Sequence, residues 1–203
     1  MESSATTASR HALARLLAGS TDAAKADAAR LIARHGSLAA VLDASAEVLI
    51  RDIPAAAAER IAAARAAQLC AQSNAIVLRP VMANRDRLDS YLRSRLAHLG
   101  REQVRALFLD KAGRLIVDEL ISEGTVDESA IFPRELVRRA LELDASALIL
   151  THNHPSQDAT PSSADIRVTK HLQRAAACLD IRLIDHIIVG STNFSMRSAG
   201  MLA

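Results

Sequence analysis

The sequence predicts an α/β domain with a mixed sheet flanked by helices, preceded by a small all-α helical domain. From about residue 9 to residue 72 the chain is alanine-rich with apolar residues at helical spacing, whereas beyond Gly100 strand-length apolar runs alternate with helical patterns. A length of 203 residues fits one domain of ordinary size plus a small accessory domain. We therefore expect a helical accessory domain over residues 1–75 and an α/β domain over residues 81–203.

Short helices account for the first region. Thr21 is suited to cap a helix that ends before Gly36. A second helical segment begins at Pro54, which suits a first helical turn, and it continues to residue 72. The proline-containing segment 73–84 breaks this pattern, so we expect the linker there. Another helix follows, whose apolar face consists of Leu88, Tyr91, Leu92, Leu96 and Leu99.

Strands and helices alternate in the second region. Two strands, EQVRALFLD and RLIVDELI, are joined by the short connection KAG, whose glycine suits a hairpin. Helices are expected at PRELVRRALEL, with Pro133 in its first turn, and at SSADIRVTKHLQRAAACL. The run SALILTHNH predicts a strand buried on both faces, and IRLIDHIIVG and the weaker TNFSMR complete the sheet.

Composition and motif searches exclude several classes of protein. No run of about 18 or more apolar residues is present, which argues against a membrane span, and the first residues lack a signal-peptide pattern. A formal net charge of +2 does not indicate general electrostatic binding to nucleic acid. Neither the helical zincin motif H-E-x-x-H nor the deaminase pair H-x-E and P-C-x-x-C occurs.

The two cysteines, Cys70 and Cys178, are isolated and show no CxxC spacing. We expect them to be reduced, buried thiols rather than a disulfide, because disulfides are rare in the reducing cytoplasm. Together with the missing signal-peptide pattern, this predicts a cytoplasmic protein.

The stretch THNHPSQDATPSSAD, residues 151–165, contains a candidate metal site. Alternate strand residues point to the same side, so His152 and His154 project together, with Cα atoms roughly 7 Å apart. Asp165 lies in the first turn of the next helix, shortly after Ser162, a suitable N-cap, and is the candidate third ligand. Two histidines and one carboxylate leave a coordination position for water, which is typical of a catalytic zinc site. A histidine pair alone is more often a surface or capping feature, so the hypothesis depends on the whole stretch.

The whole stretch resembles the JAMM (MPN-plus) metalloprotease motif H-x-H-x(7)-S-x(2)-D, which is matched by His152, His154, Ser162 and Asp165. It is closer still to the bacterial RadC-like branch, whose signature HNHPSGD-x-x-PS-x-x-D aligns with HNHPSQDATPSSAD. SEGTVDESAIFPREL before the motif and LIDHIIVG after it are also similar to that branch, so the resemblance covers about residues 81–200. The chain departs from the family at Gln157, where glycine is usual, and NFSMRSAG matches the usual SFAERG only loosely.

The resemblance implies a JAMM/MPN-type fold and zinc-dependent hydrolysis of peptide or isopeptide bonds. It implies that Zn²⁺ is bound by His152, His154 and Asp165 and that a protein or peptide is the substrate. By the same resemblance, Ser162 hydrogen-bonds the developing oxyanion; the alternative is that Ser162 only caps the helix.

JAMM enzymes use an upstream glutamate as general base, in the pattern E-x-x-G-L-L-x-G. The matching segment here begins at Glu102, which is our first candidate for the base. Glu119 is the second candidate, followed by Glu123 and Glu135. Each of these glutamates could instead be a solvated carboxylate at the end of a strand or the start of a helix.

His186 lies between apolar runs in LIDHIIVG. We expect it to be a structural, hydrogen-bonded core residue; the less favoured alternative is that it supports a metal ligand.

RadC-like proteins commonly carry a helical N-terminal region that resembles helix-hairpin-helix modules, which bind DNA phosphates. The matching segment here, IRDIPAAAAERIAAA, lacks the glycines that let a backbone approach phosphates closely. We therefore expect weak DNA binding at most. The alternative function is a DNA-repair-associated or DNA-binding protein in which the JAMM domain is a zinc-binding scaffold.

Overall fold

The computed structural model describes residues 4–17, 21–77, 80–124 and 131–202. The chain forms two compact units, Met1–Ala71 and Gln72–Ala203. The segment TVDESA, which carries part of the family resemblance, lies outside the described residues, as do residues 78 and 79 of the expected linker.

The first unit is helical, as the alanine-rich pattern predicts. Thr21 caps its second helix by accepting a hydrogen bond from the amide of Ala24 at 3.2 Å, and Gly36 ends that helix at a φ of 87°. Aliphatic side chains fill the core, among them Leu13, Leu31 and Ile61. Its helices are α1 (Ser4–Leu17), α2 (Asp22–His35), α3 (Leu38–Asp43), α4 (Ala46–Leu49) and the larger part of α5 (Ala55–Val77), whose residues 72–77 fall in the second unit.

Helix α5 ends later than the sequence pattern predicts. It continues to Val77, into the segment 73–84 that we expected to be the linker. The expectation was wrong for residues 73–77 because the residues SNAIV contain no helix breaker, and proline first occurs at Pro80.

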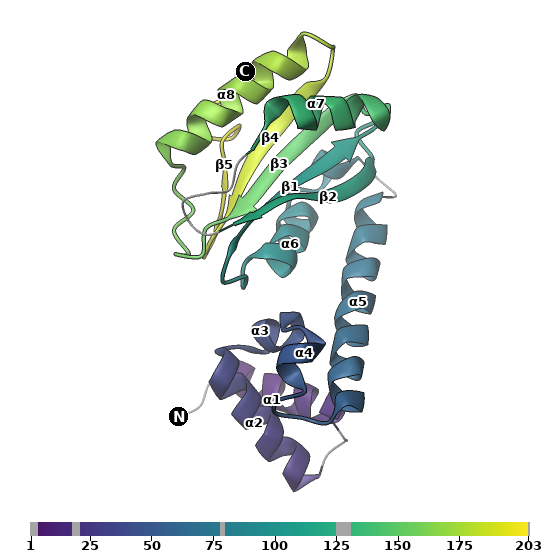
Figure 1. The fold of residues 1–203 in the computed structure, drawn as a ribbon, viewed down its shortest axis with the longest axis vertical. Coiled ribbons are helices and arrows are strands. Elements are labelled where there is room, and N and C mark those ends of the chain that lie inside the picture. Colours follow the sequence, from purple (N-terminus) through teal and green to yellow (C-terminus); the bar gives the residue numbers. More distant parts are fainter. Residues whose placement is uncertain (1–3, 18–20, 78–79, 125–130, 203) are drawn as a thin grey trace. The chain divides into compact units, whose positions relative to one another are not determined.

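A five-stranded mixed sheet forms the centre of the second unit (Figure 1). Its strands lie in the order β2-β1-β3-β4-β5, with β3 and β4 parallel and every other neighbouring pair antiparallel. The weak strand pattern near residue 194 corresponds to the short edge strand β5. The strands are β1 (Glu102–Leu109), β2 (Leu115–Gly124), β3 (Ala147–Asn153), β4 (Arg182–Val189) and β5 (Asn193–Ser195).

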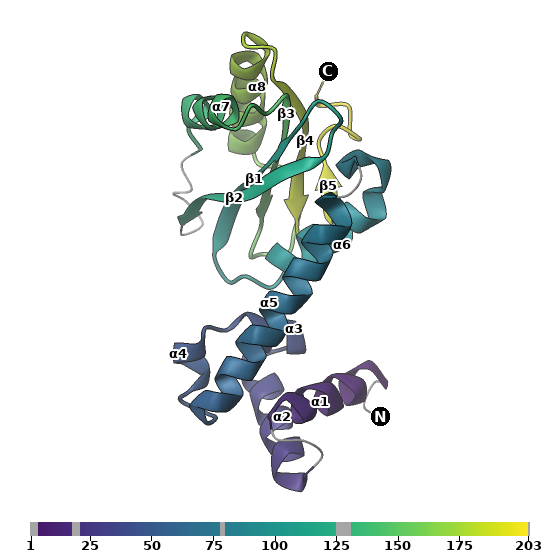
Figure 2. The same cartoon turned by 90° about the vertical axis from the view of Figure 1, so that its right-hand side faces the viewer.

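Helices cover both faces of this sheet (Figure 2). Helices α7 (Pro133–Glu142) and α8 (Ser163–Ala177) pack on one face, where side chains such as Phe108 and Leu150 are fully buried. Helix α6 (Arg85–Leu96), which follows a 3-10 turn at Val81–Ala83, packs on the other. All residues of β3 are buried, as the apolar run predicts for a strand covered on both faces.

The strand register brings the beginning of β1 to the end of β3. Val104 pairs with His152 in the antiparallel ladder between these strands. Helix α8 starts beyond the same end of β3, because β3, α8 and β4 form a parallel crossover unit. The residues of the sequence motif are therefore collected at one end of the sheet.

Cys70 and Cys178 are outside any disulfide, as expected, but both are exposed, so the expectation that they are buried was wrong. Cys70 lies on α5, and Cys178 directly follows the last residue of α8.

Among the helices of the described ranges, none combines the length and the apolar character that crossing a membrane requires.

A close approach of two loops generates a prediction. A Cβ atom on Gly190 would lie 2.5 Å from the carbonyl oxygen of Gln157 and 3.0 Å from the amide nitrogen of Ala159. Gly190→Ala should therefore lower the free energy of unfolding, measured by urea denaturation, by about 1–3 kcal/mol. Gly100→Ala is the control, since a Cβ there meets nothing within 4 Å. Equal urea midpoints for the two variants would contradict the steric argument.

Candidate metal centre

Three potential metal ligands converge at the end of β3. The Nε2 atoms of His152 and His154 are 2.9 Å apart, and the carboxylate oxygens of Asp165 lie 3.3 Å from the first and 3.6 Å from the second. One ligand atom of each residue lies within 4.8 Å of the others. The structure thus brings together the three residues whose spacing suggested a metal site.

The donor set and its spacing fit zinc. Two ligand atoms that are each about 2.0–2.1 Å from a tetrahedral zinc ion are roughly 3.4 Å from one another. The separations in this cluster are close to that value: 2.9 Å between the two Nε2 atoms, 3.3 Å from Nε2 of His152 to Oδ1 of Asp165, and 3.6 Å from Nε2 of His154 to Oδ2 of Asp165. Two imidazole nitrogens and one carboxylate oxygen are also a donor set that catalytic zinc sites use.

The start of helix α8 orients the carboxylate of Asp165. One of its oxygens, Oδ2, accepts hydrogen bonds from the amide of Ser162 at 2.8 Å and from the Ser162 hydroxyl at 2.6 Å. The amide of Asp165 donates in return to the Ser162 hydroxyl at 3.1 Å, which completes a capping box. Ser162 therefore caps the helix and holds the carboxylate; its role toward an oxyanion stays a prediction.

The histidines differ in their protonation. Burial lowers the pKa of His152 to about 4, so this ring is neutral at pH 7. The pKa of His154 is raised, chiefly by its interaction with the Asp165 carboxylate, against an opposing effect of burial. Burial alone raises the pKa of Asp165, but the interactions with His154, His152 and Ser162 outweigh it and lower that pKa overall. A metal ion therefore competes with a proton mainly at His154.

Glu102, the first candidate for the base, lies beside the ligands. It is the first residue of β1, two positions before Val104, whose partner in the ladder is His152. Alternate strand residues share a face, so Glu102 faces the same side as His152 and His154. Its charge also contributes to the raised pKa of His154, which puts the carboxylate within electrostatic range of that ring.

The other candidate glutamates have different surroundings. The carboxylate of Glu119 accepts hydrogen bonds from Arg139 on α7, which lower its pKa. Glu123 accepts a hydrogen bond from its ladder neighbour Gln103, on the opposite face of β1 from Glu102. Glu135 is paired with arginines on the outer side of α7.

Sequence reasoning did not find all the residues around the cluster. His186 is fully buried and hydrogen-bonded, as expected, but its Nε2 lies 2.9 Å from Nδ1 of His152, which corresponds to the less favoured alternative. Thr169, whose hydroxyl lies 2.6 Å from Nδ1 of His186, was not singled out. Its position one helical turn after Asp165 was a signal that could have identified it.

Gln157 shows how the chain accommodates its departure from the RadC-like motif. The residue adopts a φ of 67°, in the left-handed region that glycine enters most easily. Its carbonyl accepts a hydrogen bond from the amide of Ser191 at 2.8 Å, and its side chain donates to the carbonyl of Ala97 at 2.9 Å. These contacts fix the conformation of the loop and leave the three candidate metal ligands in place.

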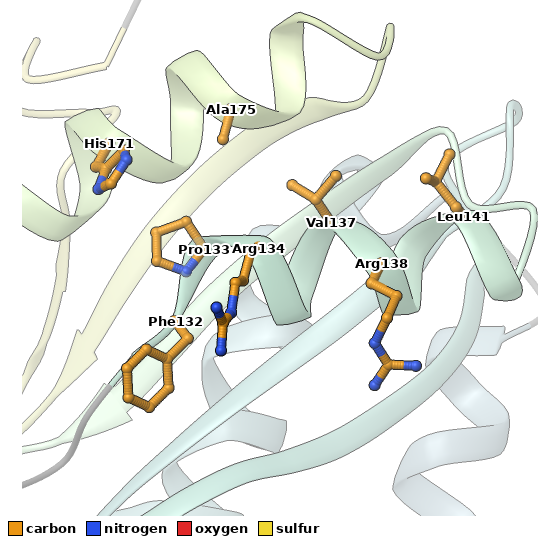
Figure 3. A pocket seen from close by; sticks show the side chains of 8 residues that line it. All are labelled: Phe132, Pro133, Arg134, Val137, Arg138, Leu141, His171 and Ala175. Carbon is orange, nitrogen blue, oxygen red and sulfur yellow. The ribbon is translucent and has the colours of Figure 1, made fainter.

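A separate apolar groove of about 640 Å³ lies between α7 and α8 (Figure 3). Phe132 and Leu141 are exposed in it, and its two arginines, Arg134 and Arg138, are engaged in ion pairs with glutamates of α7. None of the three candidate metal ligands lines this groove.

Comparisons with known proteins agree with this fold. A family model described as RadC-like JAB domain matches residues 82–201. The chain is 49% identical over 138 residues to a protein of Rhodobacter capsulatus named "UPF0758 protein". That alignment covers 68% of this chain and 64% of the relative, so the chain spans less than two thirds of the relative's length. Because the family model covers more than half of the residues, the chain belongs to the RadC-like JAB domain family.

Proposed function

We propose that the second unit is a zinc-dependent hydrolase that cleaves peptide or isopeptide bonds in a protein or peptide substrate. The observation that carries the proposal is the convergence of His152, His154 and Asp165, with Glu102 on the same face of the sheet. Zinc, when bound, acts as a Lewis acid that polarises the substrate carbonyl and lowers the pKa of a water molecule.

The protein's own residues have distinct roles in this proposal. His152, His154 and Asp165 hold the ion, and Ser162 keeps the Asp165 carboxylate in place. Glu102 accepts a proton from the attacking water and delivers it to the leaving nitrogen, which must be protonated before it departs. The placement of Glu102 beside His154 supports this assignment.

The DNA-associated alternative has less support in the helical unit. The segment IRDIPAAAAERIAAA forms the connection into α5 and the start of that helix, and it contains no glycine. Arg34 and Arg65 form ion pairs with Asp52 and Asp43, which reduces their availability to phosphates. We therefore retain weak DNA binding as the expectation and the scaffold function as an outcome of the activity test below.

The first prediction concerns metal content. The purified full chain should bind about one zinc ion, measured by elemental analysis and by competition with a chelator. Asp165→Asn removes the charge of a ligand. The zinc affinity should therefore fall by more than the roughly 10–100-fold that is typical when a residue hydrogen-bonded to a ligand is changed. Asp158→Asn is the matched control, because the Asp158 carboxylate in the same loop bonds Thr160 instead. A wild-type chain that binds no zinc when zinc is supplied would refute the centre.

The second prediction is the pH dependence of zinc binding. Protonated imidazole cannot bind a metal, so the affinity should fall as the pH drops through the raised pKa of His154. His152 is already neutral there, because its pKa is about 4. The affinity should thus fall about tenfold per pH unit, as expected for one displaced proton, in titrations from pH 7 to pH 5. A fall of about a hundredfold per unit would show that both histidines are protonated first.

The third prediction separates the base from the ligands. Glu102→Gln should leave zinc content and folding intact while hydrolysis of a responsive peptide or isopeptide substrate falls by about 10²–10⁴-fold, because glutamine cannot accept the proton. Glu119→Gln is the matched control, since Glu119 is paired with Arg139, and it should change the rate little.

Two results would count against this assignment. Loss of activity in the Glu119 variant alone would show that Glu102 is not the base. A zinc-loaded wild type that hydrolyses nothing in a broad peptide and isopeptide screen would favour the scaffold function.

A further inference from the structure

A chain of hydrogen bonds leads from His152 into the protein core. Nδ1 of His152 lies 2.9 Å from Nε2 of His186 on β4, and Nδ1 of His186 lies 2.6 Å from the hydroxyl of Thr169 on α8. The same hydroxyl donates to the backbone carbonyl of Asp165 at 2.5 Å. The side-chain members of this chain, His152, His186 and Thr169, are fully buried.

The carbonyl at the end of this chain determines where its protons lie. A carbonyl oxygen only accepts, so the single hydroxyl proton of Thr169 is directed to Asp165. The sulfur of Met196, 3.5 Å from the hydroxyl, is a weaker acceptor and competes poorly. The Thr169 oxygen must then accept a hydrogen bond from the N–H at Nδ1 of His186.

The same argument fixes which nitrogen carries the proton in each of the two histidine rings. Burial favours the neutral imidazole, which carries one N–H, so Nε2 of His186 is an acceptor. Nδ1 of His152 must therefore donate to it, and Nε2 of His152 carries the lone pair. That nitrogen is the one that faces His154 and Asp165.

We propose that Thr169 and His186 form a hydrogen-bond relay and act as positioning residues. They fix the tautomer of His152 and so present the lone pair of its Nε2 to a metal ion. This inference rests on the proposed metal centre. His154 needs no such relay, because its Nδ1 donates directly to the carbonyl of Asp158 at 2.7 Å. The relay also begins at the backbone of Asp165, so the residue that supplies the carboxylate ligand also sets the tautomer of a histidine ligand.

Removing the Thr169 hydroxyl should move the proton from Nδ1 to Nε2 in both histidine rings. In Thr169→Val, a proton on Nδ1 of His186 has no acceptor, and an unsatisfied buried donor is unfavourable. The His186 ring avoids this by moving its proton to Nε2, which faces Nδ1 of His152. His152 must then accept at Nδ1 and carry its own proton on Nε2, which blocks metal binding.

Zinc affinity of the full chain, measured with zinc alone by chelator competition, tests the relay. Thr169→Val should weaken binding about 10–100-fold, and Thr169→Ser, which keeps the hydroxyl, should restore the wild-type affinity. Thr151→Val is the matched control. Thr151 is equally buried and precedes His152, and its hydroxyl has no hydrogen-bond partner among the described residues. This control should bind zinc as the wild type does.

A second readout needs neither metal nor activity. Long-range ¹H–¹⁵N correlation spectra of the zinc-free chain at pH 7.5 should show protons on Nδ1 of both His152 and His186, and on Nε2 of both in Thr169→Val. A wild type with its His152 proton on Nε2 would overturn the relay, even if the valine variant failed to fold.

The two readouts distinguish the relay from the metal centre. A wild type with the expected tautomers that binds no zinc would refute the metal centre alone. Unchanged zinc affinity and tautomers in Thr169→Val, with zinc bound by the wild type, would refute the relay alone.

Discussion

The antiparallel register between β1 and β3 is the constraint on which the candidate centre depends. It pairs Val104 with His152 and thereby places Glu102, His152 and His154 on one face at one end of the sheet. A slip of one residue would turn every side chain of a strand to the opposite face, toward α6. The buried apolar residues that precede the site, such as Phe108 and Leu150, oppose such a slip because both faces are covered. The packing of the core therefore sets the geometry of the centre.

The first turns of α8 combine structural and chemical tasks. Asp165 completes the capping box with Ser162, offers its carboxylate to the histidines, and accepts the Thr169 hydroxyl at its carbonyl. An ionised carboxylate in a first turn is also stabilised by the helix dipole. A ligand at this position therefore favours helix formation instead of opposing it.

The elements and the ligand spacing were predictable from local sequence because they depend on short-range periodicity. The His152 and His154 pair follows from the two-residue repeat of a strand, and Asp165 follows from the helix cap. The contact between His186 and His152 was not predictable, because it depends on the parallel pairing of β3 with β4.

Two other features required information that local patterns do not contain. Glu102 and Glu119 both lie on predicted strands. They are distinguished by their surroundings, because Glu119 pairs with Arg139 of α7 and the strand register places Glu102 on the same face as the histidine pair. The exposure of Cys70 and Cys178 depends on which side of each helix the rest of the unit leaves uncovered. The extension of α5 to Val77 likewise reflects how far a helix continues when no breaker ends it.

The turn after β4 braces the ligand loop from a distant part of the sequence. The amide of His154 donates to the carbonyl of Val189, the amide of Ser191 donates to the carbonyl of Gln157, and Gly190 leaves the room that these contacts need. The loop and the turn therefore form one hydrogen-bonded unit made from two separate stretches of the chain. Grafting the candidate metal-binding loop onto another scaffold would therefore require moving both stretches together, since the turn after β4 supplies contacts that the motif itself lacks.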